Sequence, residues 1–533
     1  MPAETIPSAV MASIAARPEL EAVVEPGRRV TYRELGEMVS ASTRAMMAAD
    51  VAPGDRVAIW APNGLGWIVA ALGAQSAGAA LVPVNTRWKG EEAAYVLSAS
   101  KAAVLVTTVG FLGVDRVAML RAAPTPLPHL RRIVLLDGSP GDEGALKDAS
   151  VETWQAFAKR ASEITASAAS ERQRSVRPTD TSDILFTSGT TGRPKGVIMT
   201  HGQTVRQFRE WCEFAGLRAE DRYLIVNPFF HMFGYKAGWL ASLLQGATMV
   251  PVAVFDVPEV LRLVETERIT VLPGAPTIYR SILDHEGRKS FDLHTLRVAV
   301  TGAADIPVEL IREIRARLPF RSILVGYGLT EAGTCTGSRP DDDAETIATT
   351  AGRAMADLEI IIADREGKEV ARGATGELLV RGYSVMQGYL DDPEATAAAI
   401  DDRGFLHTGD LATMDDRGYV RIVGRLKDML IVGGFNVYPA EVENVLLSHD
   451  AIAQVAVIGV PDARMGEVAV AYVVPAAGRS LDQEAIIGWA RERLANYKVP
   501  RHLVAIAELP INAAGKVVKS DLRARAAADL KAT

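Results

Sequence analysis

Short apolar segments alternate with helix-length segments through more than half of the sequence. One strand is expected to end at Trp60, and further strands are expected at 104–106, 133–136, 224–226, 269–272, 298–300 and 323–325, with helices at 258–267, 276–284 and 307–318. Strands that are apolar on both faces need a covering layer on each side, and parallel sheets flanked by helices provide it. The alternation therefore predicts an α/β fold built on parallel sheets.

The sequence changes character after Gly352. The segments GELLVRG, GFLHTGDLA and DRGYVRIVGR are typical of short strands joined by glycine-containing turns, which favours a small, antiparallel, barrel-like β unit. The remaining residues contain helical and strand segments in the proportions of a small α+β domain. We therefore predict a large N-terminal domain at 1–424, with two parallel-sheet subdomains and the β unit, and a small mobile α+β domain at 425–533.

The charges and cysteines exclude several classes of protein. The 533 residues carry 58 Lys and Arg against 65 Asp and Glu, a net charge of −7, which disfavours general binding to nucleic acids or anionic membranes. Only Cys212 and Cys335 are present, which excludes a disulfide framework and any all-cysteine metal site. The apolar segment 67–84 is interrupted by Gln75 and Ser76, so it predicts a buried helix and strand instead of a membrane span. No signal peptide is recognised before it, and we expect a cytoplasmic protein without a nucleic-acid partner.

A loop of small hydroxyl and glycine residues, TSGTTGRPKG, directly follows the apolar segment DILF. Backbone N–H groups and hydroxyls in such a loop are able to surround a phosphate, and Lys195 adds a positive charge. We therefore expect phosphate contacts from Thr187, Ser188, Gly189, Thr190, Thr191 and Lys195. The loop lacks the Walker spacing, and taken alone it is also compatible with a surface hairpin.

Further motifs follow this loop in a fixed order: NPFFHMFG, VTGAAD, YGLTE, HTGD, GRLKDMLIVGGFNVYPAEVE and NAAGK. Together with the loop they resemble the adenylate-forming superfamily, which includes acyl-CoA synthetases, carrier-loading adenylation domains and luciferases. The resemblance extends along nearly the whole chain, so coincidence is negligible. It implies that ATP, Mg²⁺ and coenzyme A act on a small-molecule carboxylic acid.

The resemblance assigns the nucleotide contacts residue by residue. It implies that Tyr327 stacks on adenine and that Asp410 binds both ribose hydroxyls. It also implies that Thr330 contacts the α-phosphate and that Glu331 binds Mg²⁺ together with the phosphates. The other nucleotide contacts that it implies are Gly302, Ala303, Ala304, Gly328 and Arg425. Without the family context, a core tyrosine, a helix cap and an aspartate in a turn remain the alternative explanations.

The C-terminal residues are assigned in the same way. Lys516 is expected to neutralise charge on the attacking carboxylate and the α-phosphate, with Lys519 as the alternative. Lys427 matches the family's hinge between the two domains. The segment that the family presents to the CoA thiol is matched by Gly433, Gly434 and Phe435. Taken alone, Lys427 is typical of a surface charge, and the two glycines are typical of a turn between strands.

The acid is expected to bind in an apolar pocket. The residues expected to line it are Phe230, His231, Gly234, Tyr235, Gly302 and Thr334, with Cys335 nearby. His231 is counted with Lys516 and Thr330 as catalytic, but as a gate and not as a general base, because the carboxylate arrives already deprotonated. Lys236 would either meet a polar group of the acid or remain a solvated surface residue.

The reaction that the resemblance implies has two steps. The acid and ATP give an acyl adenylate and pyrophosphate, and the thiol of CoA then displaces AMP to give a thioester. The segments FFHMFGYKAG, ITVLPGAPTIY and RPDDDAETIATTAGR are most similar to actinobacterial-type ligases that activate the propanoate side chain of the indanedione left from steroid rings. Medium-chain fatty and aryl-propanoic acids are alternatives, as are loading of a carrier protein and luciferase-like oxygenation. A homodimer is also compatible with the sequence.

Overall fold

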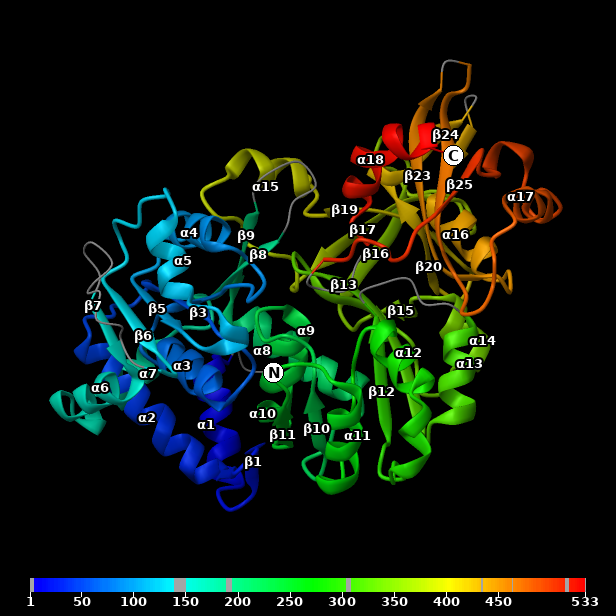
Figure 1. Ribbon diagram of the computed structural model, residues 1–533. Helices are drawn as coiled ribbons and strands as arrows, with labels where there is room; N and C mark the ends of the chain where they lie inside the picture. Colours follow the sequence, from blue (N-terminus) through cyan, green and yellow to red (C-terminus); the bar gives the residue numbers. More distant parts are fainter. Residues whose placement is uncertain are drawn as a thin grey trace.

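The computed structural model describes residues 4–138, 150–187, 194–302, 308–432, 435–462, 464–512 and 517–532. The N-terminal part of the chain is built on an eight-stranded sheet (Figure 1). In spatial order its strands are β18 (Gly388–Tyr389), β9 (Lys195–Thr200), β8 (Thr181–Thr187), β4 (Ala80–Pro83), β3 (Arg56–Trp60), β5 (Val104–Thr107), β6 (Arg132–Leu135) and β7 (Ser150–Thr153). The strands from β8 to β7 run parallel, whereas β9 and β18 are each antiparallel to their neighbour.

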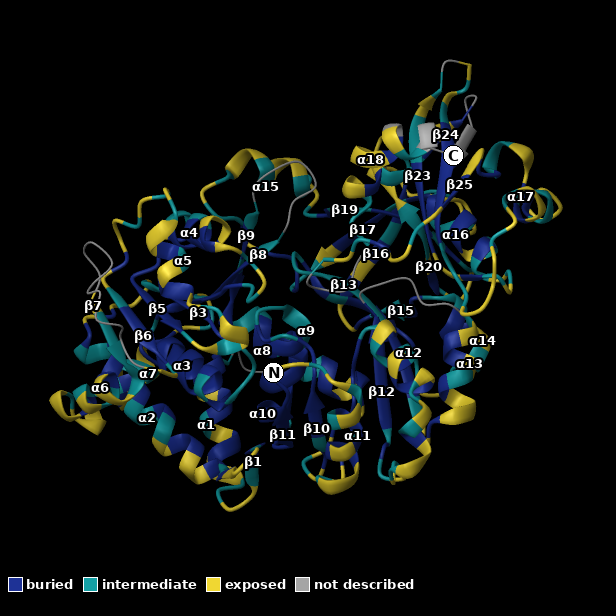
Figure 2. Ribbon diagram, viewed as in Figure 1, coloured by how far each residue is buried: buried dark blue, intermediate teal, exposed yellow. Residues whose placement is uncertain are grey.

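Both faces of this sheet are covered by helices, because successive residues of a strand point to opposite sides. Val57 and Ile59 of β3 belong to the core that includes α2 (Tyr32–Ala48) and α3 (Leu65–Ser76). Ala58 and Trp60 belong to the core that includes α4 (Gly90–Ala99) and α5 (Arg116–Ala122). Figure 2 shows the strands buried between these helices. The predicted parallel sheet with two covered faces is confirmed, as is the buried helix and strand within 67–84.

A second large sheet forms the other half of the N-terminal part. It contains β2 (Arg28–Thr31), β1 (Glu21–Glu25), β11 (Thr248–Pro251) and β10 (Arg222–Ile225), followed by β12 (Val298–Gly302), β13 (Ser322–Leu329), β14 (Gly333–Gly337) and β15 (Arg353–Ala354). Val271 joins the two sets, because it pairs in parallel with both Tyr223 and Val298. Of the strand expected at 269–272, only Val271 forms these bridges. The neighbouring backbone nevertheless bonds to the same strands, because Thr270 N donates to the Arg222 carbonyl oxygen and Leu272 N to the Val298 carbonyl oxygen.

Helices pack on the second sheet and between the two sheets. The helices α11 (Val257–Thr266), α12 (Pro276–Asp284) and α13 (Val308–Arg317) bury apolar residues against its strands. Helix α8 (His201–Phe214) contacts β8 and β9 of the first sheet and β14 of the second, and it lies at the centre of the molecule in Figure 1. The remaining helices up to residue 400 are α1 (Ile6–Ala16), α6 (Trp154–Lys159), α7 (Ala166–Ser175), α9 (Met232–Gly234), α10 (Ala241–Gln245), α14 (Ala344–Thr349) and α15 (Pro393–Ala399).

Two smaller sheets complete the fold. The first is antiparallel, as the sequence predicts, and contains β16 (Leu358–Ala363), β17 (Gly376–Gly382), β19 (Leu406–Met414) and β20 (Val420–Arg425). The second contains β22 (Phe435–Val437), β21 (Leu430–Val432), β24 (Gly466–Pro475), β23 (Ile452–Asp462) and β25 (His502–Ala505), with α16 (Pro439–Leu447), α17 (Gln483–Arg491) and α18 (Lys519–Ala532). This C-terminal sheet has apolar clusters of its own and lies at the upper right of Figure 1. The α/β fold class is confirmed, while the boundary at residue 425 stays a prediction.

No helix in the parts of the chain that the structure describes combines the length and the apolarity that crossing a membrane requires.

Candidate active site

Asp410 contacts two other residues that are predicted to bind the nucleotide. It is 4% exposed and stands on β19, directly opposite Arg425 of the neighbouring strand β20. Arg425 Nε lies 2.9 Å from Asp410 Oδ1, and Tyr327 Oη donates a hydrogen bond to Asp410 Oδ2 at 2.6 Å. Burial and the charge of Asp410 raise the pKa of Tyr327 well above its usual value, so the phenol stays protonated. Three residues predicted from separate motifs are thus in direct contact.

Glu331 follows β13 by two residues and has a neutral partner. Tyr389 Oη donates to Glu331 Oε1 at 3.0 Å, and burial raises the pKa of the Glu331 carboxyl. None of the described Lys or Arg side chains makes an ion pair with this carboxylate. A half-buried carboxylate without a cation is suited to bind one, and a hard oxygen donor fits Mg²⁺. The described residues hold no group of three or more His, Cys, Asp or Glu arranged for a metal.

The predicted phosphate loop connects β8 to β9. Thr187 ends β8 and pairs with Lys195, which begins β9, so the two flank the loop on adjacent antiparallel strands. Lys195 Nζ lies 5.0 Å from the centre of the Tyr389 ring, and the hydroxyl of the same tyrosine contacts Glu331. The loop residues Ser188, Gly189, Thr190 and Thr191 lie outside the described residues.

Two of the glycines predicted as nucleotide contacts, Gly302 and Gly328, have a packing role. Gly302 ends β12, and a Cβ at this position would lie 2.3 Å from the Gly326 carbonyl oxygen on β13. A Cβ at Gly328 would lie 2.1 Å from the Gly333 carbonyl oxygen. Contact between strands therefore requires both glycines, whatever else they contact. Thr330 is half-buried between β13 and Glu331, and Ala303 and Ala304 lie outside the described residues.

Most of the predicted acyl-pocket residues remain candidates for a pocket, whereas Tyr235 belongs to the core. Phe230, His231 and Thr334 are half-buried, and His231 Nδ1 accepts a hydrogen bond from Phe233 N at the start of α9. Gly234 is buried, and a Cβ there would lie 2.2 Å from the Pro228 carbonyl oxygen. These residues stay candidates for the pocket.

Tyr235 does not fit the prediction. It is 0% exposed, stacks on Trp239 with ring centres 4.9 Å apart, and its hydroxyl accepts a hydrogen bond from Gln75 Nε2 at 2.8 Å. Its side chain is part of the core and is not available to line a pocket. Cys335 is likewise fully buried, and burial raises the pKa of its thiol.

Both expectations for Lys236 are wrong. Lys236 is neither solvated nor exposed to a substrate, because it is 2% exposed within the π-helix Tyr235–Leu240. Its Nζ lies 2.8 Å from Oδ1 of Asp183, a fully buried residue of β8, and 3.3 Å from Thr204 Oγ1 of α8. The lysine therefore neutralises a buried carboxylate that lies 53 positions earlier in the sequence, a pairing that no local pattern indicates.

The structure describes one of the two C-terminal lysines, Lys519. Lys519 Nζ lies 2.7 Å from Oε1 of Glu443, a buried residue of α16, and the same oxygen accepts a hydrogen bond from Val457 N. Lys519 thus makes an ion pair within the C-terminal part of the protein. Lys516, Gly433 and Gly434 lie outside the described residues. Phe435 begins β22.

The predicted hinge, Lys427, lies on a short 3-10 turn, Leu426–Asp428, between β20 and β21. Partial burial and the nearby charge of Arg425 lower its pKa. Its neighbour Asp428 makes an ion pair with Arg523 of α18 at 2.7 Å, so the turn is attached to the last described helix.

Sequence comparison identifies the family. A model described as "AMP-binding enzyme" matches residues 10–390, and one described as "AMP-binding enzyme C-terminal domain" matches residues 441–516. The chain belongs to the AMP-binding enzyme family.

Two relatives carry the same name, 3-[(3aS,4S,7aS)-7a-methyl-1,5-dioxo-octahydro-1H-inden-4-yl]propanoyl:CoA ligase. They come from Rhodococcus jostii (strain RHA1) and Mycobacterium tuberculosis (strain ATCC 25618 / H37Rv). Each is 50% identical over 97% of this chain and 98% of its own length. This AMP-binding enzyme is thus an ATP-dependent ligase of the acyl-CoA synthetase class.

Solved structures agree with the fold of this AMP-binding enzyme. The anthranilate CoA ligase AuaEII in complex with anthranoyl-AMP is similar with a TM-score of 0.87 and 26% identity, covering 100% of this chain and 99% of its own. ATP-bound MatB from Rhodopseudomonas palustris is similar with a TM-score of 0.84 and 28% identity, covering 98% of both chains.

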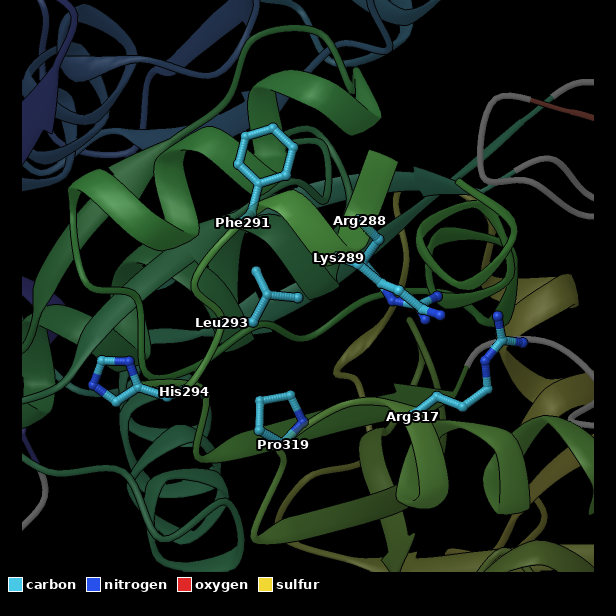
Figure 3. A pocket seen from close by; sticks show the side chains of 7 residues that line it. All are labelled: Arg288, Lys289, Phe291, Leu293, His294, Arg317 and Pro319. Carbon is cyan, nitrogen blue, oxygen red and sulfur yellow. The ribbon is translucent and has the colours of Figure 1, made fainter. Parts of the chain in front are cut away.

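A basic hollow of about 560 Å³ in the AMP-binding enzyme lies away from the predicted site residues (Figure 3). It is lined by Arg288, Lys289, Phe291, Leu293, His294, Arg317 and Pro319. These residues precede β12 and β13, so the hollow lies at the amino ends of the strands whose carboxyl ends carry Gly302 and Tyr327. Arg288 Nη1 and Arg317 Nη2 both donate to the Leu283 carbonyl oxygen near the end of α12, at 2.6 and 2.9 Å. The two arginines thus satisfy a helix C-terminus, which explains their charge without a ligand.

Proposed function

We propose that this enzyme converts the propanoate side chain of a methyl-dioxo-octahydroindene, a bicyclic diketone derived from steroid rings, into its CoA thioester. The observation that carries the proposal is the 50% identity, over nearly the full length of both chains, to two ligases named for that acyl group. The apolar residues of the candidate pocket are compatible with a bicyclic acid.

In the first step, a carboxylate oxygen of the acid attacks the α-phosphorus of ATP, and the bond from that phosphorus to the pyrophosphate oxygen breaks. Asp410, oriented by Tyr327 and Arg425, would accept hydrogen bonds from the ribose hydroxyls. Lys195 and Thr330 would contact the phosphates, and Lys516 would neutralise charge as the carboxylate and α-phosphate approach. Because phosphoryl transfer depends mainly on positioning and on charge, these residues need no protein nucleophile.

Mg²⁺, held by Glu331 together with the nucleotide phosphates, would neutralise phosphate charge when bound. The position of Glu331 after β13 and its lack of a cationic partner among the described side chains support this role.

In the second step, the thiolate sulfur of CoA attacks the acyl carbon and the bond to the AMP oxygen breaks, which gives a thioester and AMP. The C-terminal domain would turn about Lys427 so that Lys516 leaves the site and the segment 433–435 approaches the thiol.

The test measures both products directly. Purified enzyme is incubated with ATP, Mg²⁺ and CoA and with the bicyclic propanoate, medium-chain fatty acids or aryl-propanoic acids, and AMP and acyl-CoA are quantified by mass. We expect the bicyclic propanoate to have the highest kcat/KM. A higher value for a fatty or aryl acid would reassign the substrate, and thioester formation only on a carrier protein, or oxygen-dependent light emission, would reassign the second step.

Two lysine variants test the mechanism within the same assay. Lys516→Ala should abolish acid-dependent AMP formation while preformed acyl adenylate still reacts with CoA. Lys519→Met is the matched control, because it removes a lysine three positions away whose partner is Glu443. Equal loss of adenylate formation in both variants would contradict the assignment of Lys516.

A further inference from the structure

Tyr389, which no sequence motif singled out, is attached to the strand that carries the phosphate-loop lysine. It lies opposite Val197 in the antiparallel pairing of β18 with β9. The pairing continues beyond the strand, because Leu390 N donates to the Gly196 carbonyl oxygen at 2.7 Å. Gly196 directly follows Lys195, so the backbone of Tyr389 is fixed relative to the lysine.

The Tyr389 side chain contacts two groups expected to bind Mg²⁺ and phosphate. Its hydroxyl donates to Glu331 Oε1 at 3.0 Å, and Lys195 Nζ lies 5.0 Å from its ring centre, within range of a cation–π interaction. The segment before it also holds the glutamate backbone, because Met386 N donates to the Glu331 carbonyl oxygen at 2.7 Å. Two residues from distant parts of the chain therefore share one neutral aromatic partner.

The neutrality of that partner matters. A direct ion pair between Lys195 and Glu331 would use the charges that a nucleotide and its metal need, and the described contacts contain no such pair. Contact through a phenol and its ring positions both side chains, and among the described contacts neither the ammonium nor the carboxylate makes an ion pair. We propose that Tyr389 is a positioning residue that holds Lys195 and Glu331 in place, and apart, for the phosphates and metal of the incoming nucleotide. The proposal rests on the nucleotide site of the proposed function.

A second tyrosine six positions earlier has the same kinds of contact and provides a matched control. Tyr383 Oη donates to Glu210 Oε2 at 2.6 Å, and Arg206 Cζ lies 3.8 Å from its ring centre. Here the cation and the carboxylate also pair with each other, at 3.6 Å, so the charges are balanced within the protein. Neither Glu210 nor Arg206 is among the predicted nucleotide contacts.

The test measures nucleotide binding without acid or CoA, so its outcome does not depend on which acid the enzyme uses. Dissociation constants for ATP are measured by calorimetry on the full-length protein, once with Mg²⁺ and once with EDTA, for wild type, Tyr389→Phe, Tyr389→Leu and Tyr383→Phe. Tyr389→Phe keeps the ring but loses the hydrogen bond to Glu331, so binding should weaken about tenfold with Mg²⁺ and stay within about twofold in EDTA. Tyr389→Leu also loses the ring beside Lys195 and should weaken binding about threefold in EDTA as well.

The control separates positioning from general damage to the fold. Tyr383→Phe should bind ATP within about twofold of the wild type in both conditions, although it also loses a hydrogen bond between tyrosine and glutamate. Urea unfolding of each variant shows whether it is folded, and if the leucine variant is not, Tyr389→Phe decides the question. The proposal is overturned if Tyr389→Phe binds Mg·ATP like the wild type, if it loses the same factor in EDTA, or if Tyr383→Phe loses as much. Failure here would leave acyl-CoA formation by the wild type, and so the proposed function, intact.

Discussion

Asp183 and Glu331 are both withdrawn from water, but the protein treats them differently. Asp183 is fully buried and has a cation of the chain beside it, since Lys236 Nζ lies 2.8 Å away and Ser182 Oγ donates to its other oxygen at 2.7 Å. Glu331 has the phenol of Tyr389 at 3.0 Å and no ion pair within the described part of the protein. Among the described residues, Asp183 makes an ion pair with a cation and Glu331 does not.

The difference distinguishes a carboxylate that stabilises the fold, Asp183, from one that is expected to bind a ligand, Glu331. A buried charge with its own counterion holds segments together, and Asp183 with Lys236 connects β8 to the π-helix that follows the His231 motif. A carboxylate withdrawn from water without a cation destabilises the ligand-free protein and binds a cation favourably when one arrives. Of the two regions, only the one around Glu331 is therefore expected to bind a ligand.

Lys236→Met should have the largest effect, because it leaves the Asp183 carboxylate buried without a counterion. Removing one partner of a buried pair typically lowers the free energy of unfolding by about 3–5 kcal/mol. The double variant Asp183→Leu with Lys236→Met should recover most of that loss, since apolar side chains of similar size replace the pair. Urea unfolding at pH 7 measures both variants. A double variant as unstable as the single one would show that the pair has a role beyond charge balance.

His201 tests whether the same core tolerates a further positive charge. It is 1% exposed, and burial, together with the charge of Lys236, lowers its pKa to about 4. Between pH 6.5 and 4 the unfolded chain therefore binds a proton that the folded protein does not, so the protein loses stability as the pH falls through this range. The loss attributable to His201 should reach about 3 kcal/mol.

The measurement compares urea unfolding of the wild type and His201→Gln at pH 7 and pH 4.5. Glutamine retains an acceptor for the hydrogen bond that His201 Nδ1 accepts from Ile6 N. The variant should lose less stability on acidification than the wild type, and an equal loss would mean that His201 does not resist protonation.

The sequence predicted what local patterns specify. Alternating apolar segments specified the parallel sheets, and ordered motifs singled out Tyr327, Asp410 and Arg425, which the structure brings into contact. It failed where a residue's environment comes from a distant segment. Lys236 was expected at the surface or at the substrate, because nothing near it in the chain shows that Asp183 shares its buried site.

Tyr389 was missed for the same physical reason. It belongs to a strand of two residues, Gly388–Tyr389, which has no periodicity of its own and exists only because β9 supplies its hydrogen bonds. The predicted strand at 269–272 is reduced to a bridge at Val271, although Thr270 and Leu272 also bond to the strands on either side. Local propensity cannot include a partner strand that arrives from elsewhere in the chain.

Glu331→Gln tests whether this carboxylate binds the metal. Loss of the carboxylate should weaken binding of Mg·ATP by about 10- to 100-fold, while binding of ATP in EDTA changes little. Because burial raises the pKa of Glu331, the folded protein holds this proton more strongly than the unfolded chain, so stability falls as the pH rises from 4.5 through the raised pKa. Glutamine removes that fall, and the metal-free variant should be at least as stable as the wild type at pH 8. Calorimetry and urea unfolding check the two parts, and a less stable variant with unchanged Mg²⁺ dependence would place Glu331 in the structural class of Asp183.

Tyr327→Phe should have the smallest effect, because Arg425 still holds the Asp410 carboxylate when the phenol is lost. The loss of one hydrogen bond should weaken ATP binding about fivefold. If Asp410 binds the ribose hydroxyls, 2′-deoxy-ATP should bind the wild type more weakly than ATP, and this difference should shrink in the variant, since a less well oriented carboxylate gains less from the 2′-hydroxyl. Tyr279→Phe is the control, because that buried phenol donates to the Leu272 carbonyl oxygen at 2.6 Å, so the variant should lose stability while it keeps the full preference for ATP. If Tyr327→Phe weakens the binding of ATP and 2′-deoxy-ATP equally, the hydroxyl stabilises the fold around Asp410 and does not orient the carboxylate toward ribose.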